Sequence, residues 1–290
     1  MTAEPTVNPN PSPLADSAAA PAPASGTGEG FFHADGDDLI PTQLSSSPWG
    51  QVLHGRLIGG LTARAVERAR AEDPDLICTR LTIDMFRSAP LLQVRVSTRT
   101  IRAGRRIAVL EVTVEQDQGP IGQGKVVLLR RSEQPEGTFR QTPGWAAPAP
   151  GPELGSLPSG TDGRGLGRDA SRRWIAPWQA WAVAGPSGPR SGGVWVRDVY
   201  PLIAGEELTP LVRVAMAADL ASPQANSSDR GLPFINADYT LYLGREPQGE
   251  YLGIQPYGHI SERGVGVGEA VAHDVAGPLG FIATTAVANR

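Results

Sequence analysis

Two short segments of the chain carry side chains that could act on a ligand. Asp219 lies in the apolar run VRVAMAADLASP; an acid there is costly to bury unpaired, but its carboxylate could accept a proton from water. His54, Gly55 and Arg56 stand at the expected start of a helix, where glycine permits close approach of a ligand and N–H groups can stabilise negative charge. The alternatives are that Asp219 faces solvent near a helix end and that His54 only caps or packs the helix start.

Other catalytic patterns are weak or missing from the sequence. The four histidines have no metal-ligand spacing, and no G-x-S-x-G motif of a serine hydrolase occurs. The segment GRGLGR at 163–168 resembles a dinucleotide-binding loop, but no strand pattern precedes it and no helix pattern follows. The single cysteine, Cys78, cannot form an internal disulfide, and we expect it to be a small buried residue.

The composition excludes two classes of partner. With 26 Lys+Arg against 30 Asp+Glu, the chain has no basic field for nucleic acid. No apolar run approaches the roughly 20 residues that span a bilayer. Residues 1–30 contain six prolines and no aromatic residue, which predicts a disordered tail. This tail lacks the pattern of a signal peptide, and together with the single cysteine it favours a cytoplasmic location.

Helix and strand patterns occur in the same order twice along the chain. Apolar periodicity predicts a helix over 55–71, and Thr209 followed by Pro210 predicts the start of a second helix. From 143 to 170, twelve of 28 residues are Pro or Gly, so we expect a linker over 143–172. Alternating apolar residues bounded by turns predict strands at 79–87, 93–101, 107–115 and 123–131, near 192–200, and at 235–244, 250–258, 265–273 and 280–289.

A repeated signature links the two halves of the chain. Thr82 and Thr240 each begin an alternating apolar run, and Arg87 and Arg245 follow five positions later in segments that end with proline. Together with the repeated order of elements, this signature predicts two copies of one α+β unit. Their sheets can pair edge to edge, which would remove exposed strand edges. We therefore expect the functional site where the two copies meet.

The motifs in each half, in their order and spacing, resemble the acyl-CoA thioesterase II family, in its actinobacterial form. They are HGRLIGGL, RLTIDMFRSAP and IRAGRRIAVLEVTV in the first half, and VWVRDVYPLIAGEELTPLVRVAMAADLASP, FINADYTLYLGREPQGEYLG and ERGVGVGEAVAHD in the second. The resemblance covers about residues 31–290 apart from the linker. It implies two fused hotdog domains, over 31–142 and 173–290, each an antiparallel sheet wrapped around one long helix.

The resemblance also implies a reaction and the residues that carry it. Acyl-CoA would be hydrolysed by water, without a cofactor, metal or covalent acyl-enzyme. An Asp, a Thr or Ser, and a Gln would hold the water; the first two positions match Asp219 and Thr240, whereas Thr285 stands where the family has Gln. The family sequence His-Gly-Gly at the helix start assigns substrate binding to His54 and Gly55, with Arg56 in place of the second glycine. Arg56 could narrow the approach or offer a cation to a phosphate of CoA.

Two other functions stay open on the sequence. A chain that lost the Gln could bind acyl-CoA or an acyl chain without hydrolysing it. A hydratase-like hotdog enzyme is a third possibility, but it needs an Asp five residues before its motif histidine, and Trp49 occupies that position. A role in lipid metabolism and a homo-oligomeric state follow from the resemblance alone, and acyl chain length is not predicted.

Overall fold

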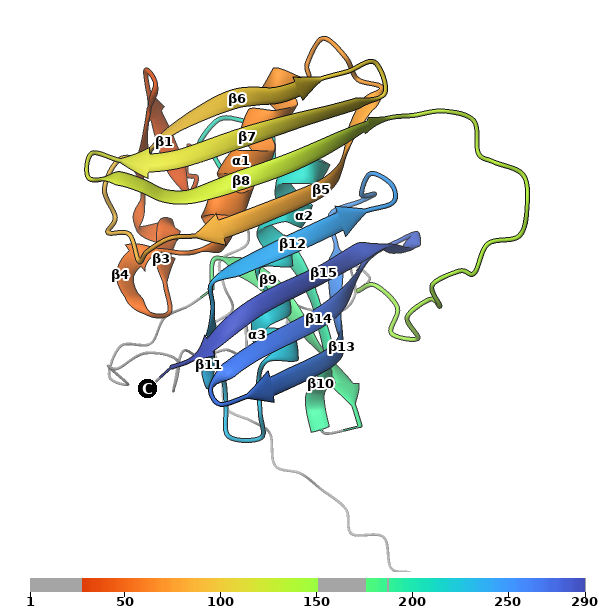
Figure 1. The fold of residues 1–290 in the computed structure, drawn as a ribbon. Coiled ribbons are helices and arrows are strands. Elements are labelled where there is room, and N and C mark those ends of the chain that lie inside the picture. The colour runs from red at the N-terminus through yellow and green to blue at the C-terminus, as the bar shows by residue number, and fades with distance from the viewer. Residues whose placement is uncertain (1–27, 151–175, 187, 290) are drawn as a thin grey trace, which may run out of the picture.

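In the computed structural model, which describes residues 28–150, 176–186 and 188–289, two antiparallel half-sheets join edge to edge (Figure 1). The described strands form one 11-stranded sheet in the order β6-β7-β8-β5-β12-β15-β14-β13-β10-β9, with β11 beside β15. The main helices lie against one face of this sheet (Figure 1). The fold is therefore α+β with two hotdog units.

The first half begins with two small hairpins and a 3-10 turn, followed by the helix and four strands. The hairpins pack the start of the chain against the second half: the Phe31 and Phe32 N–H groups donate to the carbonyls of Pro201 and Leu202. The elements are β1 (Phe32–Asp35), β2 (Asp38–Pro41), the 3-10 helix (Gln43–Ser45), β3 (Ser46–Ser47), β4 (Gly50–Leu53), α1 (Arg56–Ala69), β5 (Leu76–Met85), β6 (Arg95–Ala103), β7 (Ile107–Gln116) and β8 (Gly119–Arg130).

The second half repeats this plan with a divided helix. The elements are β9 (Trp178–Gly185), β10 (Gly188–Asp198), α2 (Pro210–Ala218), α3 (Ala221–Ala225), β11 (Phe234–Asn236), β12 (Asp238–Leu243), β13 (Leu252–Glu262), β14 (Val265–Asp274) and β15 (Gly277–Ala288). Each expected helix and strand is present with ends shifted by a few residues, except that the strand expected over 235–244 is divided into β11 and β12. Strands β1 to β4 and β9 were not expected. The expectation of one long helix per half fits α1 better than the second half, where the helix is interrupted at Asp219 and Leu220.

Most of the expected tail and linker falls on residues 1–27 and 151–175, which lie outside the described residues. The described ends of these segments are packed against the second half. Gly30 is buried, and a Cβ atom there would lie 2.6 Å from the backbone nitrogen of Ala204. Trp145 stacks on Trp195, with 5.2 Å between the ring centroids.

The seam between the half-sheets is formed by β5 and β12. Thr82 lies directly opposite Thr240 in an antiparallel register, and the Thr240 hydroxyl is hydrogen-bonded to that of Thr82 at 3.1 Å. Because the register runs in opposite directions on either side of this pair, the two copies of the signature are related by a local twofold axis. The predicted edge-to-edge pairing of two similar units is confirmed.

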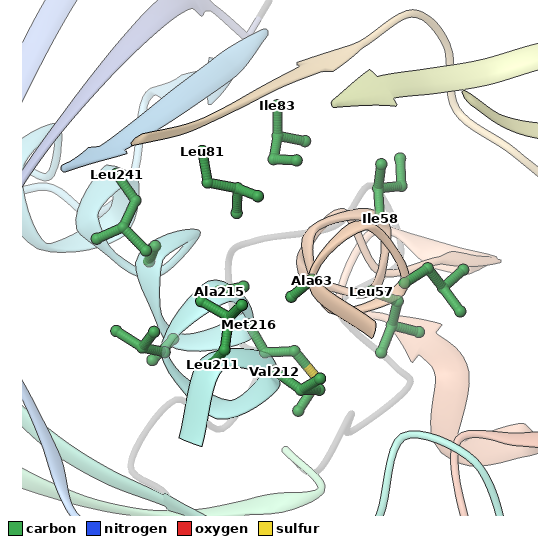
Figure 2. Packing of buried hydrophobic residues seen from close by; sticks show 14 of the residues in the cluster. Leu57, Ile58, Ala63, Leu81, Ile83, Leu211, Val212, Ala215, Met216 and Leu241 are labelled. Atoms are coloured by element: carbon green, nitrogen blue, oxygen red, sulfur yellow. The ribbon is translucent and has the colours of Figure 1, made fainter. Parts of the chain in front are cut away.

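The core lies between the seam strands and the two helices. Figure 2 shows Leu81 and Ile83 of β5 pointing toward α1 and α2, which pack side by side. Glycine makes this approach possible, since a Cβ at Gly59 would lie 3.0 Å from the Ala215 carbonyl oxygen. The buried Tyr239 hydroxyl donates to the same carbonyl at 2.6 Å. The helices of the two halves therefore form one continuous core with the seam.

Candidate active site

The start of α1 meets the end of α2 where the two halves join. Gly55 occupies the N-cap of α1 and provides no side-chain hydrogen bond to the first N–H groups of the helix. Asp219, at the C-cap of α2, is 7 % exposed. This arrangement brings a buried carboxylate from one half to the N-terminus of a helix from the other.

Asn236 orients the carboxylate of Asp219. Its Nδ2 donates a hydrogen bond to Oδ1 at 2.8 Å. His54 Nδ1 lies 3.6 Å from Oδ2 and accepts a hydrogen bond from the Arg56 N–H. Asn236 therefore fixes one oxygen while the rest of the group faces the start of α1.

Burial makes Asp219 a stronger base than a solvated aspartate. Loss of hydration raises the pKa of its carboxyl group, while the hydrogen bond from Asn236 and the nearby Arg56 oppose this change. A carboxylate with a raised pKa accepts a proton more readily at neutral pH. This electrostatic setting fits a general base.

His54 is neutral at this site. Burial, followed by repulsion from Arg56, lowers the pKa of the imidazole to about 3. The Arg56 N–H donates to Nδ1 at 3.3 Å, so the neutral ring carries its proton on Nε2. The ring also packs edge-on against Trp178, with 5.6 Å between the centroids. His54 therefore lines the site without adding a positive charge.

Gly55 lets Met85 and Asp219 pack closely against the start of α1. A Cβ atom at this position would lie 2.6 Å from Met85 Sδ and 3.7 Å from Asp219 Oδ2. A larger residue would therefore push Met85 away from the helix start. Glycine is the residue that permits this close packing.

The Arg56 side chain points away from the site into the core. It is fully buried and forms an ion pair with Asp198 at 2.8 Å. Its guanidinium also lies 4.2 Å from the centroid of a Trp178 ring. The backbone N–H of Arg56 therefore lies at the site, bonded to His54. Its guanidinium binds Asp198 and Trp178 of the other half and does not face the site.

Thr240 and Thr285 are not brought to Asp219. In β12, Thr240 alternates with the buried Tyr239 and Leu241, which face the helices. Thr240 thus lies on the opposite face of the sheet, paired with Thr82. Thr285 is exposed in β15. Its side chain lies on the outer face too.

Two polar residues that the sequence interpretation missed lie on the helix side of the sheet. One is Asn236, which donates to Asp219. The other is Thr284, which is 1 % exposed and accepts a hydrogen bond from Asn226 Nδ2 at 3.1 Å. The alternation of Tyr239, Leu241 and Leu243 could have shown that Thr240 faces outward. Nothing in the segment FINADY distinguishes Asn236 from an asparagine in a turn.

Within the described part of the chain, no group of three or more His, Cys, Asp or Glu side chains could hold a metal ion. The same residues include no helix with the length and apolar character to cross a bilayer.

Comparison with known proteins identifies two domain models that match the chain. The family model for the acyl-CoA thioesterase N-terminal domain matches residues 45–129, and the model for the C-terminal domain matches residues 143–287. A search of curated protein sequences finds no match to the chain.

Solved structures with similar folds cover nearly the whole chain. A putative thioesterase from Novosphingobium aromaticivorans is 19% identical, with a TM-score of 0.63 over 90% of this chain and 99% of that one. A putative thioesterase II from Thermobifida fusca is 17% identical, with a TM-score of 0.54 over 89% and 95%. A hotdog-fold protein of unknown function from Alicyclobacillus acidocaldarius is 14% identical, with a TM-score of 0.55 over 92% and 99%.

At these identities the solved structures show the fold, whereas the two domain models cover most of the chain and show the family. The chain belongs to the acyl-CoA thioesterase family, with an N-terminal and a C-terminal hotdog domain.

Proposed function

We propose that this protein hydrolyses acyl-CoA thioesters to free acid and CoA, with Asp219 as the general base for water. The observation that carries the proposal is the buried Asp219 carboxylate of one half at the start of α1 in the other. Its raised pKa suits proton transfer, and the adjacent N–H groups suit an oxyanion. The family supplies the thioester substrate class.

The reaction uses the two sides of the site for different tasks. Asp219 takes a proton from water as the water oxygen attacks the thioester carbon. The carbonyl oxygen gains negative charge, and N–H groups at the start of α1 stabilise it. When the intermediate collapses, the carbon–sulfur bond breaks and the protonated Asp219 returns its proton to the thiolate. Acid and CoA leave, and no acyl group becomes attached to the protein.

The surrounding residues hold the reacting groups in place. Asn236 fixes Asp219 through Oδ1, and the neutral His54 lines the carboxylate without protonating it. Gly55 has no side chain between the helix start and Asp219, and the flexible Met85 side chain beside it would move aside for the thioester. We further propose a cytoplasmic, homo-oligomeric protein, the location resting on the single cysteine and the oligomeric state on the family resemblance alone.

A second candidate is an acyl-CoA binding protein without hydrolytic activity. It is favoured by the position of Thr240 and Thr285, which the resemblance implies as water ligands but which lie on the outer face of the sheet. If the remaining polar groups cannot orient water, the substrate would bind and persist.

A panel of acyl-CoAs of increasing chain length separates the two candidates. Binding is measured by calorimetry, and release of free CoA by a thiol reagent, on the same preparation. Hydrolysis of at least one bound acyl-CoA supports the enzyme. Tight binding of several members without CoA release supports the binding protein, and binding of none contradicts both.

A further inference from the structure

A groove opens on the outer face of the sheet, on the side away from the helices. Its volume is about 580 Å³, within the range of roughly 300–1,000 Å³ that is usual for small-molecule sites. It lies at one end of the seam, where β5 and β12 separate: their pairing ends at Arg80 and Tyr242. Beyond this pair, β5 continues beside β8 and β12 beside β15.

A β-bulge in β5 lies next to Arg80, the arginine that lines the groove. The register of β5 with β8 shifts between Cys78 and Arg80, so that Thr79 is an extra residue. Bulges of this kind change the direction of a side chain. As a result Thr79 and Arg80 both line the groove, and the Thr79 hydroxyl is satisfied by the Val127 carbonyl at 3.2 Å.

The Arg80 guanidinium has no anionic partner among the described residues. Its Nε atom is buried and has no hydrogen-bond acceptor there. Arg80 is also the one charged residue among those that line the groove. A buried N–H donor of a charged group without an acceptor is unfavourable, so an anion that enters the groove would relieve this cost.

Much of the remaining wall is apolar. Its apolar residues include Val127 and Leu129 of the first half and Leu279 and Phe281 of the second. Leu129 is 38 % and Phe281 54 % exposed. Large apolar side chains at this exposure gain free energy when an apolar ligand covers them.

We propose that this groove binds a monocarboxylate with an unbranched alkyl chain. The carboxylate would accept hydrogen bonds from Arg80, whose planar guanidinium matches its geometry. The alkyl chain would lie along the apolar walls. The site is separate from Asp219, because it lies on the other face of the sheet, and the proposal does not depend on the proposed hydrolysis.

A local reporter at the groove tests the proposal with decanoate as the probe. Gln141 lines the groove and is exposed, so Gln141→Cys can carry an environment-sensitive bimane. The natural Cys78 stays unlabelled, because burial raises the pKa of its thiol to about 12. Calorimetry on the unlabelled wild-type protein provides the same dissociation constant without the dye.

Four variants on this background define the site. Arg80→Gln removes the cation, and Gly244→Leu fills the groove at a position where a Cβ meets only the Leu279 carbonyl oxygen, at 3.8 Å. Arg99→Gln removes an exposed arginine of β6 that pairs with Glu111, away from the groove. Asp219→Asn serves as the second control, because decanoate could also occupy the proposed active site as a product.

We expect saturable binding of decanoate that weakens at least tenfold in Arg80→Gln, is lost in Gly244→Leu and is unchanged in both controls. Decanol, which has the same chain length without the charge, should bind at least tenfold more weakly. The proposal is overturned if decanoate shows no saturable binding by either readout. Equal affinity in Arg80→Gln and wild type, or equal affinity for decanol, would also contradict it.

Discussion

The N-termini of α1 and α2 each meet an acid from the other half. Only at α2 does the N-cap side chain bind both a helix N–H group and the acid. At α2, the Thr209 side chain accepts a hydrogen bond from the Val212 N–H and donates one to Glu67 Oε2 at 2.7 Å. Pro210 removes a further N–H donor at that start. At α1, Gly55 makes no side-chain cap, and the acid is Asp219.

This difference shows how a duplicated fold can hold one site instead of two. A capped helix start has its N–H groups and its acid already satisfied, so it stabilises the fold and leaves little for a ligand. At the start of α1, the Leu57 and Ile58 N–H groups donate to backbone carbonyls and the Arg56 N–H donates to His54 Nδ1, while the buried Asp219 carboxylate is held through Oδ1 by Asn236. The duplication places a helix start beside an acid of the other half twice. The residues at the N-caps then determine at which of the two places the acid can act on a ligand.

The largest difference in the rate of CoA release is expected between variants of the two acids, Asp219 and Glu67. Asp219→Asn should lower the rate of CoA release by about 100- to 10,000-fold, because a general base is lost while the side-chain shape is kept. Binding of acyl-CoA should change little. The matched variant Glu67→Gln, at the capped helix start, should remain within about twofold of wild type. Equal losses in both variants would mean that the two ends are not functionally distinct.

A smaller loss is expected at the residue that orients Asp219. Asn236→Leu removes the 2.8 Å hydrogen bond to Oδ1 and should slow CoA release about tenfold, equivalent to about 1.4 kcal/mol of activation free energy. Steady-state kinetics would show the loss in kcat. An unchanged kcat would mean that Asp219 needs no help from Asn236.

The cap of α2 should matter for stability and not for activity. Thr209→Ala removes the side-chain cap and should lower the free energy of unfolding by about 1 kcal/mol, measured by urea denaturation. The kcat of the folded variant should match wild type. A large loss of activity at unchanged stability would place the α2 start in the mechanism.

The smallest effects are expected on the outer face of the seam. Thr240→Val and Thr285→Gln should leave kcat within about twofold of wild type, since both side chains lie on the sheet face opposite Asp219. The Gln variant restores the residue type that the family resemblance implies. A clear gain in kcat from Thr285→Gln would show that this side chain reaches the site during turnover.

The sequence predicted the architecture well because the fold depends on local periodicity. Strands β5 and β12 follow from alternating apolar residues, and the Thr82 and Thr240 signature predicted that they are equivalent strands. Which strands would pair at the seam was not predicted. Strand β9 was missed, because WQAWAVAG is rich in alanine and contains one β-branched residue. The interruption after α2 was also missed, since the apolar pattern continues through Leu220.

The site was less predictable because it depends on directions that spacing does not report. Asp219 and Gly55 were identified, but they meet only through the packing of the two halves. The Arg56 side chain turns into the core because Asp198, 142 positions away, supplies its counter-charge. Asn236 reaches Asp219 from β11, a strand of three residues.

The most direct test of the central claim is the pH dependence of a single turnover. Hydrolysis needs Asp219 without its proton, so the rate should fall as the pH drops through the pKa of this carboxyl group. Burial raises that pKa, and the fall should therefore begin above the pH range of an ordinary aspartate. Loss of the Asn236 hydrogen bond, which lowers the pKa, should move the fall to still higher pH in Asn236→Leu. Identical pH profiles in wild type and Asn236→Leu, or the same acidic fall in the residual rate of Asp219→Asn, would contradict Asp219 as the base.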